Sequence, residues 1–457
     1  MISINVDDKE LIVEKNLRLI DVLIKNDIKI PYFCYQEALG ADGNCRMCMV
    51  EIEGQKRPQI ACDTFVKEGM SVHTKSEKIR KVQQNILELE LINHPIDCPV
   101  CDQAGECKLQ DFYMDYGLYD SHFDSSKKVH HKKHIDLGSN VILDQERCVL
   151  CARCTRFTSN ITKTNELGIV GRGDKAHVST IPGRKLDNPY AMNVVDLCPV
   201  GALTSKDFRF HQRSWFLKSS PSICHGCATG CNITIDHNKE KYGDDTIYRF
   251  RPRVNHDVNG HFICDEGRLS YKELEQNRQR EFTCNSEVCS KDEALKSFTQ
   301  TLKSAKNIAV LIDANLYNEE IDAILEFAQS LNAKCASLKE SYYDREFEDE
   351  WLKSAWRAAN IMKINQLNIA ENFDDSKIDL LINFNHKEAK DIKAETKVLF
   401  STHQEEADIV FSIASFSENS GTLTNRDNII QRCEKAVSKN SPSPTIIELL
   451  SDIKEMM

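Results

Sequence analysis

Polar and apolar residues alternate at the start of the chain. The alternation covers residues 2–6 and 10–13, which predicts two short strands joined by a turn. Helical spacing follows over 17–26, and a further strand is expected over 49–53. Residues 1–75 are therefore predicted to form a small α+β domain.

A longer helix is predicted directly after this domain. Ser76 is a favourable N-cap, and Pro95 should end the helix because the residue before a proline is biased away from helical geometry. The apolar positions that recur at helical spacing between them are Ile79, Val82, Ile86 and Leu89. His94 is thereby placed at a helix end, at the start of a cysteine-rich loop.

The C-terminal part of the chain has a different pattern. Apolar runs of strand length occur together with an amphipathic helix over 319–331. The runs cover residues 308–312, 378–382, 397–400 and 407–411. Strands that alternate with helices are typical of a parallel α/β sheet, which we expect here.

Composition narrows the class of protein. The chain has 457 residues, of which 41% are hydrophobic and 28% charged, and this predicts a soluble globular protein of several domains. No apolar run reaches the about 18 residues of a membrane span, and the N-terminus does not resemble a signal or transit peptide. The net charge of −11 argues against nucleic acid as the main partner. The basic segment 120–135 is expected to be a solvated connection.

The chain contains 19 cysteines. A secreted disulfide scaffold does not fit this length, the odd number of cysteines and the lack of a signal sequence. Close C-x2-C spacing points instead to metal binding. Fifteen cysteines and one histidine fall into four sets of four. The remaining cysteines, expected to be small buried or surface thiols, are Cys284, Cys289, Cys335 and Cys433.

The first set is Cys34, Cys45, Cys48 and Cys62. Its layout is that of plant-type [2Fe–2S] ferredoxins, with a longer first gap. Gly43 permits a close backbone turn, and Arg46 lies between two thiolates, where positive charge would offset a negative cluster. Structural zinc is the alternative, although zinc sites usually pair two C-x2-4-C knuckles.

The second set is His94, Cys98, Cys101 and Cys107. The spacing H-x3-C-x2-C-x5-C alone admits zinc on three cysteines and a histidine as well as a [4Fe–4S] cluster with one imidazole ligand. A neutral imidazole in place of a thiolate removes a negative charge, which tends to raise the reduction potential.

The third set is Cys148, Cys151, Cys154 and Cys198. Its C-x2-C-x2-C run is that of bacterial two-cluster ferredoxins, in which a further Cys-Pro serves the other cluster. Here Thr158 occupies that place, and the matching Cys-Pro lies downstream at Cys198. The four cysteines are therefore expected to hold one [4Fe–4S] cluster, with zinc as the less favoured alternative.

The fourth set is Cys224, Cys227, Cys231 and Cys264. It resembles the cluster motif at the N-terminus of molybdopterin oxidoreductases, and Gly226 and Gly230 permit tight wrapping of the loop. Zinc is again the alternative. Residues 168–173 read G-x-x-G-x-G, which is not the dinucleotide fingerprint, and we expect a turn there.

Taken together, the four sets resemble those of the 75-kDa-type iron–sulfur subunits of NADH:quinone oxidoreductases (respiratory complex I), a family with bacterial and mitochondrial members. The resemblance covers residues 1 to about 280 and includes all four motifs in the family's order. It implies a [2Fe–2S] cluster on the first set, a His-ligated [4Fe–4S] cluster on the second and a [4Fe–4S] cluster on the third. The fourth set would hold an additional [4Fe–4S] cluster found in some bacterial members, which, with the lack of a transit peptide, indicates a bacterial protein.

The rest of the chain resembles a molybdopterin-enzyme domain. Residues 265–268 follow the last ligand as in that family, and residues 418–426 are similar to its E-x-x-G-T-x-x-N segment. The part after Leu274 is short for an active pterin domain and has no cysteine in a convincing ligand context. We therefore expect a degenerate scaffold without molybdopterin.

The predicted fold is a multi-domain α+β chain. A β-grasp [2Fe–2S] ferredoxin domain is expected at 1–75, a His-Cys₃ [4Fe–4S] domain at 76–120 and a ferredoxin-like [4Fe–4S] domain at 138–215. A molybdopterin-oxidoreductase-type [4Fe–4S] domain at 218–275 and a truncated α/β domain at 300–457 complete it.

The resemblance implies an electron-transfer subunit of a proton-translocating NADH dehydrogenase, with no complete active site in this chain. Electrons would arrive from an FMN/NADH-binding subunit and pass the clusters of the second and third sets. They would leave toward quinone through a ferredoxin-like subunit with two [4Fe–4S] clusters. The first cluster would be adjacent to this route and the fourth off it. Quinone-site subunits complete the expected partners, and the chain would be peripheral, on the cytoplasmic side of the bacterial inner membrane.

Three alternatives remain open at this point. A diaphorase-linked subunit of an NAD-linked hydrogenase would have no use for residues 305–457. The N-terminal part of an iron-only hydrogenase would be followed by further cysteine motifs after Cys264. A formate dehydrogenase chain would need a molybdenum ligand, more length and usually a cysteine at Thr158. A zinc-stapled interaction protein would be colourless, whereas the iron–sulfur hypothesis predicts a brown protein with about 14 iron atoms per chain.

Overall fold

Two compact units, residues 1–216 and 217–457, make up the computed structural model, and each is described by itself. The structure describes all residues except 119, 125, 127, 374–376 and 388–391. The predicted solvated connection at 120–135 includes 125 and 127, which lie outside the described residues. Among the helices that the structure describes, none is long and apolar enough to cross a membrane.

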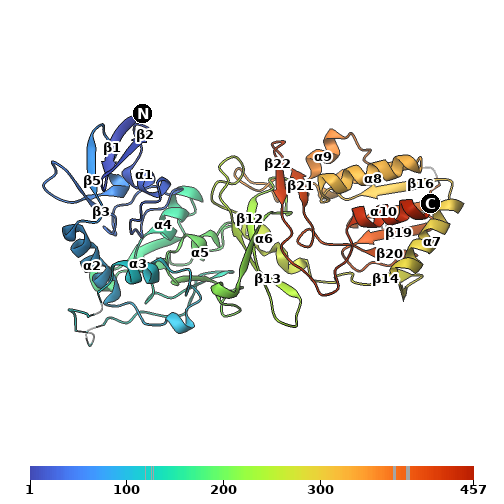
Figure 1. Ribbon diagram of the computed structural model, residues 1–457. Helices are drawn as coiled ribbons and strands as arrows, with labels where there is room; N and C mark the ends of the chain where they lie inside the picture. The colour runs from blue at the N-terminus through green and yellow to red at the C-terminus, as the bar shows by residue number, and fades with distance from the viewer. Residues whose placement is uncertain (119, 125, 127, 374–376, 388–391) are drawn as a thin grey trace. The chain divides into compact units, whose positions relative to one another are not determined.

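A five-stranded sheet with the order β2-β1-β5-β3-β4 forms the N-terminal part of the first unit (Figure 1). Its elements are β1 (Ile2–Val6), β2 (Lys9–Val13), α1 (Leu19–Lys25), β3 (Met49–Ile52), β4 (Gln59–Ile60) and β5 (Met70–His73). Strands β1 and β5 are parallel, and the other neighbours are antiparallel. Asp7 and Asp8 turn the first hairpin with φ of 47° and 68°, which aspartate tolerates. This confirms the predicted ferredoxin-like fold.

Helix α2 (Glu77–Leu91) follows, and Ser76 caps it as predicted, since its Oγ accepts from the backbone N–H of Ile79 at 3.2 Å. The spacing predicted the helix but not which face it buries. Ile79, Gln83 and Leu87 are buried, whereas Leu89 is 58% exposed. The buried face follows the i, i+4, i+8 row, in which the polar Gln83 takes the middle position.

The rest of the first unit consists of short elements connected by long loops. These are α3 (Lys108–Tyr116), β6 (Ile135–Asp136), β7 (Val141–Leu143), α4 (Arg153–Arg156), a π-helical turn (Phe157–Ile161), β8 (Leu167–Val170), β9 (His177–Thr180), α5 (Asn193–Leu197) and β10 (Leu203–Ser205). The sheet order β10-β7-β6 places residues far apart in sequence on neighbouring strands. Residues 168–173 form the end of β8 and the turn of the β8–β9 hairpin, with φ of 76° at Gly171. The predicted turn is thus preceded by a strand.

The second unit begins with an antiparallel sheet of the order β11-β12-β13. The strands are β11 (Lys218–Ile223), β12 (Asn232–Lys239) and β13 (Asp245–Pro252), and the short helix α6 (Asp265–Leu269) follows them. The loop between β11 and β12 and the N-terminus of α6 carry the fourth ligand set.

A seven-stranded sheet of the order β15-β14-β20-β19-β18-β16-β17 dominates the second unit. Its strands are β14 (Phe282–Cys284), β15 (Glu287–Cys289), β16 (Ile308–Ile312), β17 (Lys334–Ala336), β18 (Leu380–Phe384), β19 (Thr396–Ser401) and β20 (Ile409–Ser412). Strands β16 to β20 are parallel, which confirms the prediction, whereas β14 and β15 add an antiparallel edge that the pattern did not predict.

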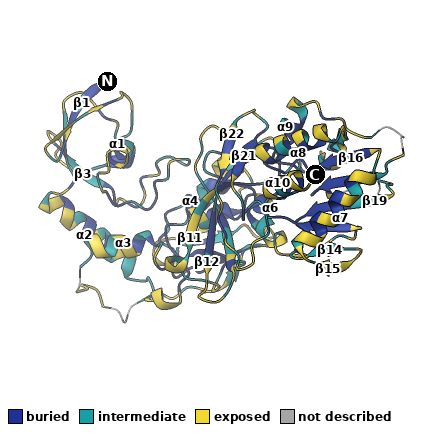
Figure 2. Ribbon diagram, turned by 45° about the vertical axis from the view of Figure 1, so that its right-hand side comes forward, coloured by how far each residue is buried: buried dark blue, intermediate teal, exposed yellow. Residues whose placement is uncertain are grey.

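One face of this sheet carries most of the core. Helices α7 (Lys291–Ser304), α8 (Asn318–Ser330), α9 (Ile361–Gln366) and α10 (Ile446–Met456) bury apolar residues in one cluster with alternate strand positions such as Val310 and Ile382. The intervening positions, among them Leu311 and Leu381, belong to a smaller cluster. Figure 2 shows the buried strands and the exposed outer side of α7. The hairpin β21 (Gly421–Thr424) and β22 (Ile430–Cys433) completes the unit.

Candidate metal centres

The first set lies on the loop between α1 and β3 and on the 3₁₀ turn Ala61–Asp63. Cys34, Cys45, Cys48 and Cys62 are all at most 8% exposed. The backbone N–H of Cys34 donates to Cys45 Sγ at 3.5 Å. Hydrogen bonding among the thiols, above all between Cys34 and its neighbours, lowers the pKa of Cys34 and raises the pKa values of Cys45 and Cys62. Four converging sulfur donors of this kind fit an iron–sulfur cluster or zinc.

The side chain of Arg46, which was expected to offset the charge of the first cluster, is exposed. Two cations that contact this loop come from the third set. Arg156 donates to the carbonyl oxygen of Cys34 and, at 3.2 Å, to that of Gly40. Arg153 donates to the carbonyl oxygen of Tyr35. The sequence did not predict these contacts, since more than a hundred residues separate the partners.

The second set surrounds a small cavity of about 20 Å³ just beyond the end of α2. His94, Cys98, Cys101 and Cys107 all line it. Burial, together with the charges of Arg147 and Lys128, lowers the pKa of His94 to about 4, so the imidazole is neutral near pH 7. A metal ligand needs this neutral form. Burial raises the pKa of Cys107 to about 11, whereas Cys98 is exposed.

The third set also surrounds a cavity of about 20 Å³, in an almost wholly apolar environment. Cys148, Cys151, Cys154 and Cys198 line it together with residues such as Leu143 and Val178. Burial raises the pKa of Cys151 to about 12 and that of Cys154 further. Thr158, at the place of the absent cysteine, is buried and donates its hydroxyl to the carbonyl oxygen of Thr155 at 3.0 Å.

The backbone of this third loop is strained between the cysteines. Leu150 and Ala152 have φ of 48° and 58°, which residues with a Cβ rarely adopt. Both residues separate successive cysteines, and the backbone N–H of Leu150 donates to Cys148 Sγ at 3.4 Å. The loop therefore wraps its amides and sulfurs around one centre, as a bound cluster would require.

The fourth set lines one wall of a larger cavity of about 390 Å³ in the second unit. Cys224, Cys227, Cys231 and Cys264 are all buried. The backbone N–H groups of Gly226 and Gly267 donate to Cys224 Sγ and Cys264 Sγ at 3.4 and 3.3 Å. Burial raises the pKa of Cys264 to about 11. Amides aimed at sulfur are the donors that stabilise a negatively charged cluster.

Gly201 joins the second and third sets. It lies three residues after Cys198, and a Cβ at this position would stand 2.2 Å from Cys101 Sγ. The backbone N–H of Lys108 also donates to the carbonyl oxygen of Pro199 at 3.0 Å. Within the first unit, the third set is therefore in contact with both the first and the second. The sequence shows Gly201 as the last residue of the Cys-Pro-Val-Gly segment, but it does not show that this glycine packs against Cys101.

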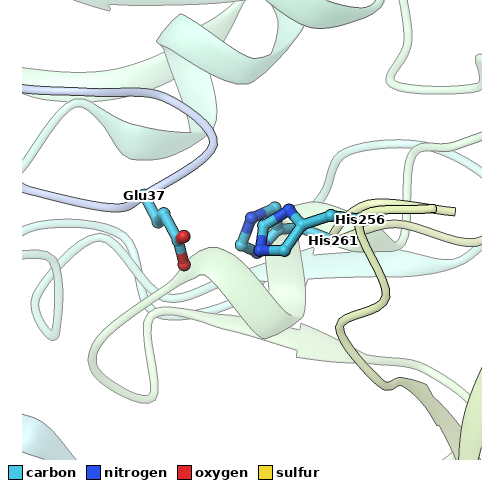
Figure 3. Close-up of side chains that lie close together, drawn as sticks. All are labelled: Glu37, His256 and His261. Atoms are coloured by element: carbon cyan, nitrogen blue, oxygen red, sulfur yellow. The ribbon is translucent and has the colours of Figure 1, made fainter. Parts of the chain in front are cut away.

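The cysteines outside the four sets are partly or wholly buried thiols, as expected. Cys284 and Cys289 lie on the β14–β15 hairpin, where burial first, and then hydrogen bonding between their side chains, raises the pKa of Cys289 to about 12. Cys433 is fully buried. Two further imidazoles, His256 and His261, lie with ring centroids 5.3 Å apart on a tight loop (Figure 3). Two ligands are fewer than a closed zinc site uses.

Four family descriptions match successive parts of the chain. "2Fe-2S iron-sulfur cluster binding domain" matches residues 1–77, and "NADH-ubiquinone oxidoreductase-G iron-sulfur binding region" matches 83–122. "NADH-quinone oxidoreductase subunit 3, ferredoxin-like domain" matches 138–204, and "Molybdopterin oxidoreductase Fe4S4 domain" matches 217–276. The chain belongs to the 75-kDa-type family of NADH:quinone oxidoreductase subunits. The predicted order of the motifs of this family is thereby confirmed.

Curated relatives agree with this assignment. The NADH-quinone oxidoreductase G-type subunit of Streptomyces coelicolor is 36% identical over 338 residues, which are 72% of this chain and 39% of the relative. The same subunit of Rickettsia felis is 35% identical over 349 residues, 75% of this chain and 51% of the relative. The NADH-ubiquinone oxidoreductase 75 kDa subunit of Reclinomonas americana is 40% identical over 278 residues, 61% of this chain and 39% of the relative. The chain thus spans about half, or less, of these relatives.

One solved structure is similar to part of the chain. It is described as "Crystal structure of NAD+-reducing [NiFe]-hydrogenase in the H2-reduced state". The similarity covers 46% of this chain and 90% of that chain at 29% identity, with a TM-score of 0.42. This superposition is too loose to bear on the fold of this member of the 75-kDa-type family.

Proposed function

We propose that this chain is the iron–sulfur electron-transfer subunit of an NADH:quinone oxidoreductase (complex I). The observation that carries the proposal is the convergence of four separate ligand sets on buried sites, each within one family match. The spacing of the ligands and the family matches support one [2Fe–2S] cluster on the first set and [4Fe–4S] clusters on the other three. No molybdopterin is proposed.

The residues proposed as ligands are those predicted from the sequence. They are Cys34, Cys45, Cys48 and Cys62; His94, Cys98, Cys101 and Cys107; Cys148, Cys151, Cys154 and Cys198; and Cys224, Cys227, Cys231 and Cys264. Bound clusters would supply one-electron transfer without bond chemistry in the protein. The role of the chain is to hold the clusters close together, exclude water and set their potentials through ligands and hydrogen bonds.

The contacts in the first unit favour a route from the first set through the third to the second. Arg153 and Arg156 tie the first loop to the third, and Gly201 packs on Cys101 of the second. The proposal therefore includes the first cluster in the route, in contrast to the expectation that it stands beside the route. The exposed Cys98 supports the second set as the exit, because short distances to an external acceptor favour electron transfer there. The fourth cluster is proposed as an addition off this route.

The proposed partners are the other peripheral-arm subunits of such a complex. They comprise an FMN/NADH-binding subunit, a ferredoxin-like subunit with two [4Fe–4S] clusters and the subunits of the quinone site. The chain would be a peripheral member on the cytoplasmic side of the bacterial inner membrane. The division into domains at 1–75, 76–120, 138–215, 218–275 and 300–457 is part of the same proposal.

Metal analysis of the full chain, purified without oxygen, tests the proposal. A brown protein with about 14 iron atoms per chain is expected. A colourless protein with four zinc ions per chain would refute it. Reduction of the bound clusters by hydrogen, and not by NADH, in the native complex would assign the chain to an NAD-linked hydrogenase instead.

The variant His94→Ala tests the ligand assignment of the second set. The imidazole is expected to be a ligand, so its removal should abolish or destabilise one [4Fe–4S] signal in low-temperature EPR. The [2Fe–2S] signal of the same sample is the internal control and should persist. Retention of every cluster signal in the variant would contradict the role of His94.

A further inference from the structure

Arg153 is a buried cation in the loop of the third set, with only 4% of its surface exposed. Its guanidinium donates to the carbonyl oxygen of Leu197 at 3.0 Å and to that of Tyr35. Leu197 directly precedes Cys198 of the third set, and Tyr35 directly follows Cys34 of the first. One side chain therefore bridges the backbones next to ligands of two different sets.

The charge of Arg153 is not balanced by a carboxylate. In the described part of the chain no acidic side chain forms an ion pair with it, and its buried Nε has no hydrogen-bond partner. Burial lowers the pKa of Arg153, and the charges of Cys151, Cys198 and Cys34, with Tyr32, oppose that lowering. A buried charge without a counter-charge is strongly unfavourable, so the thiolates of a bound cluster would be the counter-charges of this guanidinium.

Two other buried or half-buried arginines near these ligand sets, Arg147 and Arg156, differ in this respect. Arg147, which lies beside Cys101, pairs with Asp97 at 3.1 Å and with Asp144 at 3.2 Å. Arg156 contacts the same first loop as Arg153, but its Nε lies 3.8 Å from a carboxylate oxygen, Oδ1 of Asp42. Of Arg147, Arg153 and Arg156, Arg153 is thus the one without a carboxylate partner, and its charge faces the sulfur ligands and the ring of Tyr32.

We propose that Arg153 is a shared counter-ion of the clusters held by the first and third sets and raises the reduction potential of both. The inference rests on the proposed function. Addition of one electron makes a thiolate-ligated cluster more negative, and a fixed positive charge nearby favours that reduced form. The arginine stays protonated in both states, so this side chain takes up no proton when the electron arrives. Because one charge acts on both clusters, it raises both potentials together.

An EPR-monitored redox titration of the full chain, purified without oxygen, tests this role. The variant Arg153→Gln removes the charge and keeps an N–H donor for the carbonyl of Tyr35, whereas Arg153→Lys keeps the charge. In the Gln variant we expect the ratio of reduced to oxidised cluster at a fixed potential to fall about tenfold for both clusters. This corresponds to a shift of about 59 mV for a one-electron couple. The Lys variant should remain close to the parent protein.

Arg156→Gln is the matched control, because it removes a cation that contacts the same loop but has a carboxylate partner. It should shift the two potentials clearly less than Arg153→Gln, and the His-ligated cluster should respond to neither. Loss of clusters in Arg153→Gln but not in Arg153→Lys would also support the charge requirement. Equal behaviour of the Gln and Lys variants, or an equal shift in the Arg156 control, would overturn the proposal. Absence of iron from the parent chain would instead refute the proposed function.

Discussion

The contact between Gly201 and Cys101 gives the sharpest test of how the second and third sets fit together. In Gly201→Ala the new Cβ would lie 2.2 Å from Cys101 Sγ and 3.1 Å from Gln103 Cβ. Ordinary contacts between such atoms are about 3.5–4.0 Å, so the sulfur must move by more than about 1 Å. The alternative, a shift of the backbone, costs about 1–3 kcal/mol, as overpacking does in general. A ligand displaced this far no longer reaches a metal bonded at about 2.3 Å.

The expected result is selective loss of one cluster. Iron should fall from about 14 to about 10 atoms per chain, and the EPR signal of the His-ligated cluster should disappear while the [2Fe–2S] signal remains. Gly168→Ala is the control, since a Cβ at that position meets no atom within 4 Å. Full iron content and an intact His-ligated signal in Gly201→Ala would show that the side chain of Cys101 is not a ligand in this position.

Two further predictions concern the stability of the second unit. Burial raises the pKa of Glu418, but the pairing with Arg278 at 2.7 Å holds it at about 2, below its ordinary value of 4.5. The pair should therefore contribute about 3 kcal/mol above pH 4.5, and this contribution should be lost as the pH falls from about 4.5 to 2. The free energies of unfolding of Glu418→Gln and of the parent protein should therefore converge as the pH falls through that range. A difference that stays constant with pH would contradict this prediction. Phe400→Ala should cost about 3–5 kcal/mol in urea unfolding, because the fully buried ring stacks on two others at 4.6 and 4.7 Å. A loss of less than about 1 kcal/mol in the free energy of unfolding would refute this packing argument. The control is Val288→Ala, because the side chain of Val288 is 69% exposed.

The sequence alone was enough to predict the four ligand sets, because most of their members lie close together on single loops. C-x2-C spacing confines two sulfurs to one turn, and the chain between them needs no tertiary information. Local patterns also determined the capped start of α2, the first hairpin and the parallel strands of the second unit. The alternation of burial along a strand and the requirements of a helix N-terminus depend on neighbouring residues only.

The tertiary structure alone decided which set lies beside which and what charge faces it. Arg46 was expected to offset the first cluster by its place in the sequence, but its side chain is exposed, and Arg153 and Arg156 approach from more than a hundred residues away. The sequence also could not predict the contact of Gly201 with Cys101 or the exposure of Leu89. Both depend on packing against residues that are distant in the sequence. Spacing specifies a ligand set because coordination is local. The electrostatic environment of that set depends on the whole fold, because charge acts through space rather than along the chain.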